Sequence, residues 1–423
     1  MRQIMRTIAV IAPLFIIGCG SNLSEPNNET VKGGELVVNF SADAMKKILL
    51  DAGAIEANAT VYGYKAFKIP YTTTNEEGDD VKASGLLVIP TGLPAVVNQI
   101  GLSMVSDDHG TIFANREAPS VIGDTNGAPD GSAIILTSIG GFATLQPDYI
   151  GFGDANDQYH PFVLKDSLAN ATVDFINTVK TFAMDNNITL NNQLFLTGYS
   201  EGGYAAMATL KKIEEESTGL TVTMAAPMAG PYALKLMADG VLSEPTLGVP
   251  SFMANVAYAY AKANNQELTS IINEPYASQL PTLFNGTLDR TQIDPQLTQD
   301  TTGSTGLFSQ NFVGDYFTND TNWFRVATTE NSVYQWSPQI PVKLVHCKGD
   351  DVIPYKISQL TAGTMTAMGA RSVEIVPVEL TLYASNPSKY SADANITHGT
   401  CGSLAYTVTT GIFATVRKST IGY

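Results

Sequence analysis

The polarity of the chain varies with two periods, one typical of strands and the other of helices. Apolar or alternating runs predict strands at residues 62–74, 81–90, 100–106, 142–150, 193–198, 221–230, 341–348 and 372–380. Apolar residues spaced three and four apart predict helices at residues 42–51, 166–187, 204–216 and 402–418. Strands that alternate with helices in this way indicate an α/β fold, with a mostly parallel sheet covered by helices on both faces.

Residues 231–335 interrupt this alternation of strands and helices. The segment is rich in Ala, Tyr, Asn, Gln and Thr, and residues 256–268 within it have a helical pattern. It lies between two predicted strands of the core. This position favours a helical cap inserted into one domain, which residues 36–230 and 336–423 would form. An independent second domain is the alternative.

The first residues of the chain are predicted to direct export. Arg2 and Arg6 precede an apolar stretch at residues 8–17, which is too short to span a bilayer and is typical of a signal peptide. The stretch ends in Ile-Ile-Gly-Cys, which resembles the lipobox of bacterial lipoproteins. That resemblance implies that residues 1–18 are removed as a lipoprotein signal peptide and that Cys19 is acylated.

The residues that follow Cys19 favour a protein held at a membrane by its N-terminal lipid. Residues 19–35 are polar and predict a flexible tether. We therefore expect an exported lipoprotein of the cell envelope, at the outer membrane or the cell surface, that contacts the membrane through its anchor. The alternative is an ordinary signal peptide followed by an unrelated cysteine.

The composition limits the partners that the chain can bind. The 423 residues carry a formal net charge of −16, and no basic run follows the N-terminus. Nucleic-acid binding requires a basic surface, so nucleic acid is excluded as a partner. The four histidines are scattered, and no Cys/His spacing typical of a metal site is present, so we expect no bound metal. The oligomeric state stays open.

The segment LFLTGYSEGGY, residues 194–204, surrounds one serine with glycines. An apolar run precedes Gly198 and the helical pattern of residues 204–216 follows Gly202, so Ser200 is expected at a tight strand-to-helix turn. In this context G-x-S-x-G forms a nucleophile elbow, which exposes the serine hydroxyl. We therefore predict that Ser200 is a catalytic nucleophile. An ordinary turn punctuated by glycine is the alternative.

The general base is predicted by elimination among the histidines. A serine nucleophile needs a base, and the base needs a carboxylate to orient it. On a sheet with this elbow, the acid and then the histidine follow the serine in the chain. His109 and His160 precede Ser200, and His346 ends a predicted strand directly before the acid candidates. His398, in a polar loop before the last predicted helix, is therefore the expected base.

The acid is expected in the segment LVHCKGDDVIP, where a predicted strand ends. A carboxylate just past a strand end lies at the same edge of the sheet as the elbow. Asp350 and Asp351 stand side by side at this point. The aspartate that is not the acid is expected to stabilise the turn or to cap a helix.

Backbone N–H groups are expected to stabilise the negative charge that develops on the substrate oxygen. One donor is predicted at Glu201, the residue after the nucleophile. The second is predicted at Gly110 or Thr111, because the sequence His109-Gly110-Thr111 resembles the His-Gly motif of oxyanion holes. The His109 side chain is equally consistent with a positioning role that involves no contact with substrate.

Several segments together resemble one family. The elbow, HCKGDDVIP, the His-Gly pair at residues 398–399 and the HGT…APS segment are similar to the α/β-hydrolase superfamily. Within it they resemble the secretory lipase (lipase A-type) family and its bacterial lipoprotein relatives. The resemblance implies an α/β-hydrolase fold and a carboxylic ester hydrolase, an esterase or lipase, that uses a triad and no cofactor. In that superfamily the acid commonly precedes the proline by four residues, which selects Asp350 over Asp351.

One residue departs from the family pattern and keeps other functions open. Members of the lipase A type often have a residue smaller than Glu201 after the serine. The GxSxGG form also occurs in prolyl-oligopeptidase-like hydrolases, so a serine peptidase or acyl-aminopeptidase with the same triad is the second interpretation. A binding protein on an inactive hydrolase scaffold is the third. The intact set of Ser200, Asp350 and His398 argues against that third interpretation.

Two of the three cysteines are predicted to form a disulfide. Cys347 lies three residues before Asp350, and Cys401 lies three residues after His398. If Asp350 contacts His398, the two loops run side by side and bring the cysteines within the reach of a disulfide. Export to an oxidising compartment permits the bond. Two buried, reduced thiols are the alternative.

Overall fold

The protein is described by a computed structural model, which places residues 29–124, 129 and 131–423. In that part of the chain, ten strands form one sheet with the order β1-β2-β3-β4-β6-β5-β7-β8-β9-β10. The strands are β1 (Glu29–Val31), β2 (Gly34–Phe40), β3 (Gly63–Thr74), β4 (Asp80–Thr91), β5 (Leu102–Asp108), β6 (Ala143–Pro147), β7 (Leu190–Tyr199), β8 (Met224–Met228), β9 (Val342–His346) and β10 (Val373–Pro377).

The sheet is antiparallel toward one edge and parallel over the rest. Antiparallel ladders join β1, β2, β3 and β4 in turn, and β4 to β6. Parallel ladders join β6 to β5 and continue through β7, β8 and β9 to β10. Because the carboxyl ends of parallel strands meet at one edge, the residues that follow β5, β7 and β9 gather on the same side of the molecule.

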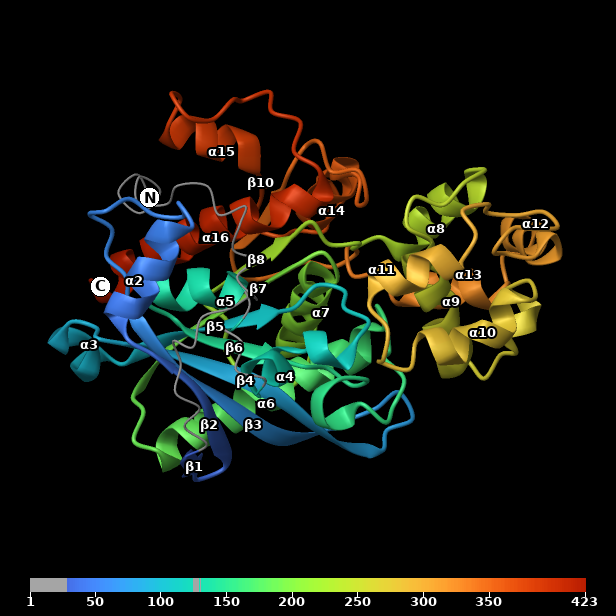
Figure 1. Cartoon of the computed structure of the whole chain (residues 1–423). Helices are drawn as coiled ribbons and strands as arrows, with labels where there is room; N and C mark the ends of the chain where they lie inside the picture. Colours follow the sequence, from blue (N-terminus) through green and yellow to red (C-terminus); the bar gives the residue numbers. More distant parts are fainter. Residues whose placement is uncertain (1–28, 125–128, 130) are drawn as a thin grey trace.

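Helices cover both faces of the sheet, as the alternation in the sequence predicted (Figure 1). Leu194 and Leu196 of β7 pack in a buried cluster with α6 and α7, whereas Phe195 packs in a second cluster with α2 and α16. The split follows from the two-residue period of a strand. The helices of this part are α2 (Ala42–Asp51), α3 (Ala95–Ile100), α4 (Pro119–Asp124), α5 (Gly131–Ile134), α6 (Lys165–Asp185), α7 (Glu201–Glu215), α14 (Tyr355–Ala367), α15 (Val378–Ser385) and α16 (His398–Ile421).

The segment between β8 and β9 contains helices and no strand of the sheet. Figure 1 shows these helices grouped to one side of the sheet. They lie within residues 231–335, the segment that the sequence analysis expects to be a cap. They are α8 (Leu234–Ser243), α9 (Pro250–Ala263), α10 (Tyr276–Leu283), α11 (Arg290–Ile293), α12 (Gln310–Thr318) and α13 (Trp323–Glu330). Short 3-10 or π turns complete the chain at η2 (Asn115–Glu117), η3 (Ile135–Ile139), η4 (Gly153–Ala155), η5 (Leu268–Ser270) and η6 (Asp294–Gln296).

The end of the last strand and the start of the sheet both differ from what the sequence predicted. The strand predicted at residues 372–380 ends at Pro377, because the apolar residues beyond it bury one face of helix α15 instead of continuing the ladder with β9. Residues 29–35, the end of the segment expected to be a flexible tether, form β1 and the start of β2, which pair as an antiparallel hairpin. The predicted signal peptide at residues 1–18 and the rest of the predicted tether lie outside the described residues.

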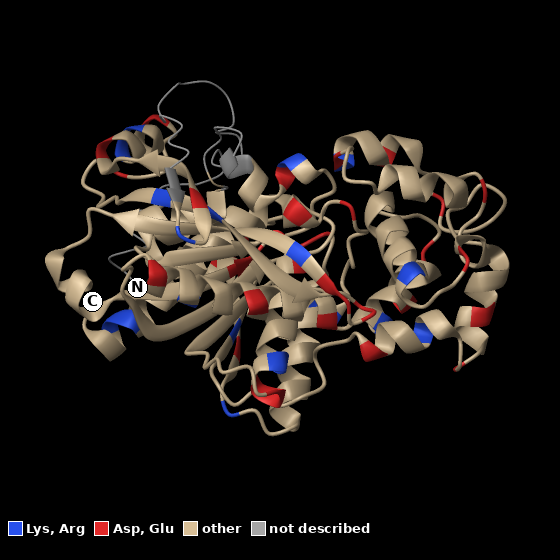
Figure 2. Ribbon diagram, turned by 90° about the horizontal axis from the view of Figure 1, so that it is seen from below, with Lys and Arg blue, Asp and Glu red and all other residues tan. Residues whose placement is uncertain are grey.

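Charged residues occur in every part of the fold. Figure 2 shows Lys and Arg interspersed with Asp and Glu over both the sheet region and the helices α8 to α13. Among the residues that the structure describes, no helix is both long enough and apolar enough to cross a membrane.

Candidate active site

Ser200 stands at a sharp turn between strand β7 and helix α7. Its φ of +60° and ψ of −119° lie in a region that most side chains avoid, and such strain is common at functional turns. Its backbone N–H donates to the Met228 carbonyl at 2.9 Å, which ties the turn to strand β8. The strand, turn and helix predicted around the serine are all present.

The glycines around Ser200 are required because neighbouring backbone approaches them closely. A Cβ on Gly198 would lie 2.4 Å from the Asp108 carbonyl oxygen, and one on Gly202 would lie 1.8 Å from the same oxygen. A Cβ on Gly203 would lie 2.3 Å from a carbonyl oxygen of β8. These distances are far below van der Waals contact, so any larger residue would push α7 away from the sheet and displace the serine.

Three segments that are distant in the sequence meet at Ser200. His398 Nε2 lies 2.9 Å from Ser200 Oγ, and His398 Nδ1 lies 2.7 Å from Asp350 Oδ2. Asp350 follows β9 and His398 begins α16, so the sheet and the last helix bring these side chains together. In this geometry an imidazole can accept the hydroxyl proton while a carboxylate holds the ring.

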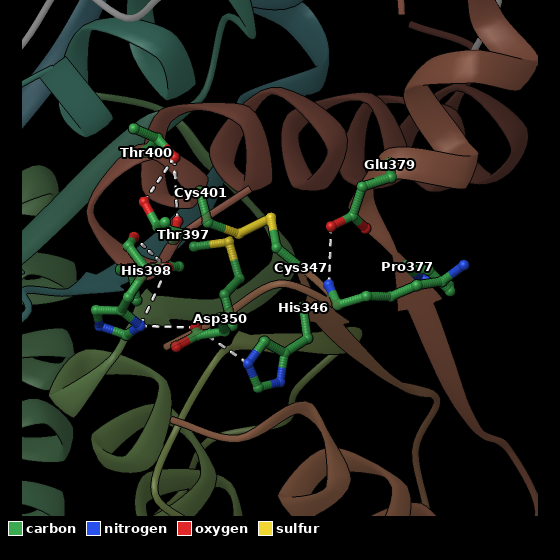
Figure 3. The surroundings of a disulfide bond; sticks show 12 residues. His346, Cys347, Asp350, Pro377, Glu379, Thr397, His398, Thr400 and Cys401 are labelled. Carbon is green, nitrogen blue, oxygen red and sulfur yellow. Dashed lines mark hydrogen bonds and ion pairs between the residues drawn. A yellow bond between two sulfur atoms is a disulfide. The ribbon is translucent and has the colours of Figure 1, made fainter. Parts of the chain in front are cut away.

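The Asp350 carboxylate is completely buried and saturated with hydrogen-bond donors. Oδ1 accepts from the backbone N–H groups of Val352 and Ile353, at 3.0 and 2.8 Å. Oδ2 accepts from His398 and also from His346 Nε2, at 3.1 Å (Figure 3). Burial disfavours the charged form, but the hydrogen bonds from His346 and His398 outweigh it and hold the pKa of Asp350 well below its usual range.

Asp351 is exposed and caps the helix that carries the imidazole. Its Oδ1 accepts the backbone N–H of His398 at 2.9 Å. His398 is therefore the first residue of α16, and the expectation that it lies in a loop before a helix starting near Gly402 is wrong. The capping carboxylate comes from 47 residues earlier in the chain, so the local sequence around His398 did not reveal it.

The backbone groups predicted to bind an oxyanion lie next to Ser200. Glu201 is the first residue of α7, and the first N–H groups of a helix have no partner within it. Gly110 packs against the elbow, because a Cβ there would lie 3.0 Å from the Tyr199 carbonyl oxygen and 3.9 Å from Ser200 Cβ. Thr111 lines the same cavity as Ser200 and Glu201.

The His109 side chain is held by protein groups on both of its nitrogens. Nε2 lies 3.1 Å from the Asp148 carbonyl oxygen, and Nδ1 lies 2.7 Å from the Gly110 carbonyl oxygen. The ring packs on Tyr149 with ring centroids 4.3 Å apart. Of the two roles considered for His109, these contacts favour the one in which it positions the loop at residues 110–111.

A histidine that the sequence left without a role, His160, holds the Glu201 side chain. His160 Nε2 lies 2.7 Å from Glu201 Oε1, and Nδ1 lies 2.8 Å from the Ile150 carbonyl oxygen. Only 8% of His160 and 1% of Glu201 is exposed. The imidazole thus supplies the polar partner that the buried acidic side chain directly after Ser200 needs.

Tyr199 is a second contact of the imidazole that the sequence did not indicate. Its hydroxyl donates to the His398 carbonyl at 2.8 Å, and the two rings pack with centroids 4.9 Å apart. Burial, together with the carboxylates of Asp350 and Asp351, raises the pKa of Tyr199, so its hydroxyl keeps its proton.

A disulfide joins Cys347 to Cys401, with the two Cα atoms 6.0 Å apart. Cys347 follows β9, and Cys401 lies in the first turn of α16. The bond therefore ties the loop that carries Asp350 to the helix that begins with His398 (Figure 3). Both cysteines are completely buried.

A cavity of about 430 Å³ opens on Ser200 and reaches helices α8 and α9. Its core side includes Thr111, Glu201 and Asp351. Its other walls are mostly apolar side chains, among them Leu234, Met237, Val241, Leu247, Phe252, Met253, Val256, Phe308 and Phe324. Ser200 therefore lines a space suited to an apolar group.

The remaining site predictions concern a metal and a lipid. Within the described ranges, no group of three or more His, Cys, Asp or Glu residues is arranged to hold a metal ion. Cys19, the predicted site of acylation, lies outside the described residues.

The mostly parallel sheet and the strained serine turn between a strand and a helix define an α/β-hydrolase. Solved structures share this fold. A Legionella pneumophila protein described as a hydrolase matches with a TM-score of 0.76 and 23% identity, over 90% of this chain and 96% of the other. The rice cell wall degrading esterase LipA of Xanthomonas oryzae matches with a TM-score of 0.73 and 24% identity, over 93% of this chain and 98% of the other. Candida antarctica lipase A matches with a TM-score of 0.56 and 16% identity, over 74% of this chain and 72% of the other.

The family is defined by the sequence itself. The family model of secretory lipases matches residues 132–394, which is more than half of the chain. The chain therefore belongs to the secretory lipase family, and its class of activity is hydrolysis of esters. The comparison with curated proteins found no match.

Proposed function

We propose that the protein is an exported serine ester hydrolase in which Ser200 is the nucleophile, His398 the general base and Asp350 the acid. The observation that carries the proposal is the unbroken contact from Ser200 Oγ to His398 at 2.9 Å and from His398 to Asp350 at 2.7 Å. Membership of the secretory lipase family supports carboxylic esters as the substrates rather than peptides.

The reaction follows from the positions of these groups. Ser200 Oγ attacks the acyl carbon while His398 Nε2 takes the hydroxyl proton, and Asp350 stabilises the imidazolium that forms. The N–H groups of Glu201 and of the loop at residues 110–111 bind the oxyanion. The imidazolium then protonates the leaving alcohol, which leaves an acyl-enzyme. Water, deprotonated by His398, releases the acid and restores the serine.

The cavity supports an ester with an apolar acyl or alcohol group. Ser200 lines it, and many of its apolar walls come from α8 and α9. We propose that residues 231–335 act as a cap that shapes this cavity over the core of residues 36–230 and 336–423. We further propose that residues 1–18 direct export and that Cys19 carries the lipid anchor.

The first test is the Ser200→Ala variant. We expect it to fold as the wild type does and to keep only the small acceleration that binding and the oxyanion hole provide, a loss of roughly 10⁶-fold in kcat. Release of 4-nitrophenol from esters measures it, and a fluorophosphonate should label the wild type but not the variant. Full activity in a folded Ser200→Ala protein would refute the proposed nucleophile.

The second test separates the substrate classes. Purified protein is assayed with 4-nitrophenyl esters of increasing acyl length and with aminoacyl anilides of matched size. We expect turnover of the esters, with a chain-length preference set by the cavity, and little turnover of the anilides. Faster cleavage of the anilides would favour a peptidase with the same triad.

A further inference from the structure

We infer that His346 is a positioning residue of the site: it holds, from the side opposite His398, the same oxygen of Asp350 that orients the catalytic imidazole. The inference rests on the proposed function and deepens it, because it adds a second imidazole to the acid. The sequence had set His346 aside as a candidate base because it ends a strand directly before the acid.

Two imidazoles meet on one carboxylate oxygen. Asp350 Oδ2 lies 2.7 Å from His398 Nδ1 and 3.1 Å from His346 Nε2, and Figure 3 shows Asp350 between the two rings. The same Nε2 lies 3.0 Å from the Ile353 carbonyl oxygen. Both neighbours of this nitrogen are acceptors, so Nε2 must carry a proton, which it shares between them.

The other nitrogen of His346 has a partner that suits this tautomer. Nδ1 lies 2.8 Å from Ser358 Oγ, on helix α14, and a hydroxyl can donate to an unprotonated ring nitrogen. The ring is completely buried and packs edge-on against Tyr355, with centroids 5.4 Å apart. His346 is therefore held in one orientation by α14 on one side and by the acid on the other.

The location of His346 explains why this contact matters. His346 is the last residue of β9, which pairs with strands on both sides, whereas Asp350 lies on the loop beyond the strand. A donor at the end of a paired strand fixes the position of Oδ2, and Oδ2 in turn fixes the His398 ring. Placement of the base is critical, since a shift of about 1 Å at an active site costs roughly 100-fold in rate.

The test compares two substitutions of His346. His346→Leu has a similar size but no donor, and His346→Gln can place an amide N–H near the position of Nε2. We expect kcat for ester hydrolysis to fall about 10- to 100-fold in the leucine variant, with KM within about twofold of the wild type, and to recover largely in the glutamine variant. Thr361→Ala on α14 is the control, because the Thr361 hydroxyl donates only within its own helix, to Ile357.

The kinetic outcomes are decisive in both directions. Loss of kcat in the leucine variant with recovery in the glutamine variant supports positioning through the N–H donor. An unchanged kcat in His346→Leu overturns the inference, and so do equal losses in both variants, which would indicate only packing.

A spectroscopic test does not depend on catalysis. Nitrogen-15 NMR of protein labelled at histidine, with His346 assigned from its missing signals in His346→Gln, reports the protonation of each ring nitrogen. We expect a protonated Nε2 on His346, and an unprotonated Nε2 overturns the inference even where His346→Leu does not fold. Failure of the proposed function is distinguishable, because it is decided by the Ser200→Ala variant.

Discussion

The residues around the serine turn combine a strained backbone with buried carboxyl groups. Ser200 has a positive φ, and Asp350 and Glu201 are both buried close to it. An ionised carboxylate is costly to bury alone. Each of the two carboxyl groups contacts an imidazole, Asp350 at His398 and His346, and Glu201 at His160. Three of the four histidines of this chain thus contact a buried acid.

The two adjacent aspartates are expected to differ sharply in their effect on rate. Asp350→Asn should lower kcat by roughly three to four orders of magnitude, because the amide cannot both hold Nδ1–H and stabilise the imidazolium. Asp351→Asn should cost only a fewfold loss, because Asp351 contacts a backbone N–H of His398 and not its ring. Steady-state ester hydrolysis measures both. The opposite ranking would assign the acid to Asp351.

The buried pair of His160 and Glu201 is expected to stabilise the fold. His160→Ala should lower the free energy of unfolding by about 3–5 kcal/mol, because it leaves the Glu201 carboxyl buried without its partner. The double variant His160→Ala/Glu201→Ala should lose less than the sum of the two single variants, with a coupling of roughly 0.5–3 kcal/mol. Urea unfolding of the four proteins measures the coupling. Simple additivity would show that the contact contributes nothing.

The loop after strand β9 and the start of helix α16 carry the proposed acid and the proposed base. The loop after β9 supplies Asp350, the cap Asp351 and one cysteine, and the first turn of α16 supplies His398 and the other cysteine. The imidazole is therefore fixed by its helix, by the capping carboxylate and by the disulfide. Tyr199, at the end of strand β7, adds its ring and hydroxyl.

Loss of the disulfide is expected to affect the stability of the protein more than its rate of ester hydrolysis. The bond closes a loop between residues 54 apart, so Cys347→Ser/Cys401→Ser should lower the free energy of unfolding by about 2–4 kcal/mol. Chemical unfolding with and without dithiothreitol measures it. Under reducing conditions the wild type should approach the variant, and the variant itself should not respond. Insensitivity of the wild type to reduction under unfolding conditions would count against the bond.

At the scale of the whole molecule, Ser200 lines a cavity whose walls come both from the sheet region and from residues 231–335. The sheet and helices α6, α7 and α16 hold the serine and its partners, and helices α8 and α9 provide most of the apolar wall of the cavity. We therefore expect changes in residues 231–335 to alter which ester fits the cavity without moving Ser200, His398 or Asp350.

The proposed lipid anchor is expected to set where the molecule is found. Cys19→Ser should yield a protein that no longer partitions into detergent or fractionates with membranes, while ester hydrolysis by the released protein stays unchanged. Mass spectrometry of the N-terminal peptide measures the modification directly. A mature wild-type protein that starts at another residue and carries no acyl chain would contradict the lipobox interpretation.

The sequence by itself determined the fold class and the identities of the serine, acid and base candidates that the structure brings together. The period of the apolar residues predicted strands β3 to β10 and helices α2, α6 and α7, because burial of one face leaves a local, repeating mark. Strands β1 and β2 and most of the shorter helices were not predicted. The glycines at 198 and 202 indicated the turn at Ser200, since close backbone approach restricts residue type at fixed positions. The order in which serine, acid and histidine follow one another along the chain then led to Asp350 and His398 as the partners of Ser200.

Only the tertiary structure decided which groups hold these side chains. Three single contacts are involved: His346 with Asp350, His160 with Glu201, and Asp351 with the start of α16. The last two contacts join residues that are 41 and 47 apart in the sequence. A single contact of this kind leaves no periodic pattern, because it depends on where two elements come to rest against each other. The start of α16 at His398 was missed for the same reason, since its cap comes from the loop after β9 and not from the residues beside it.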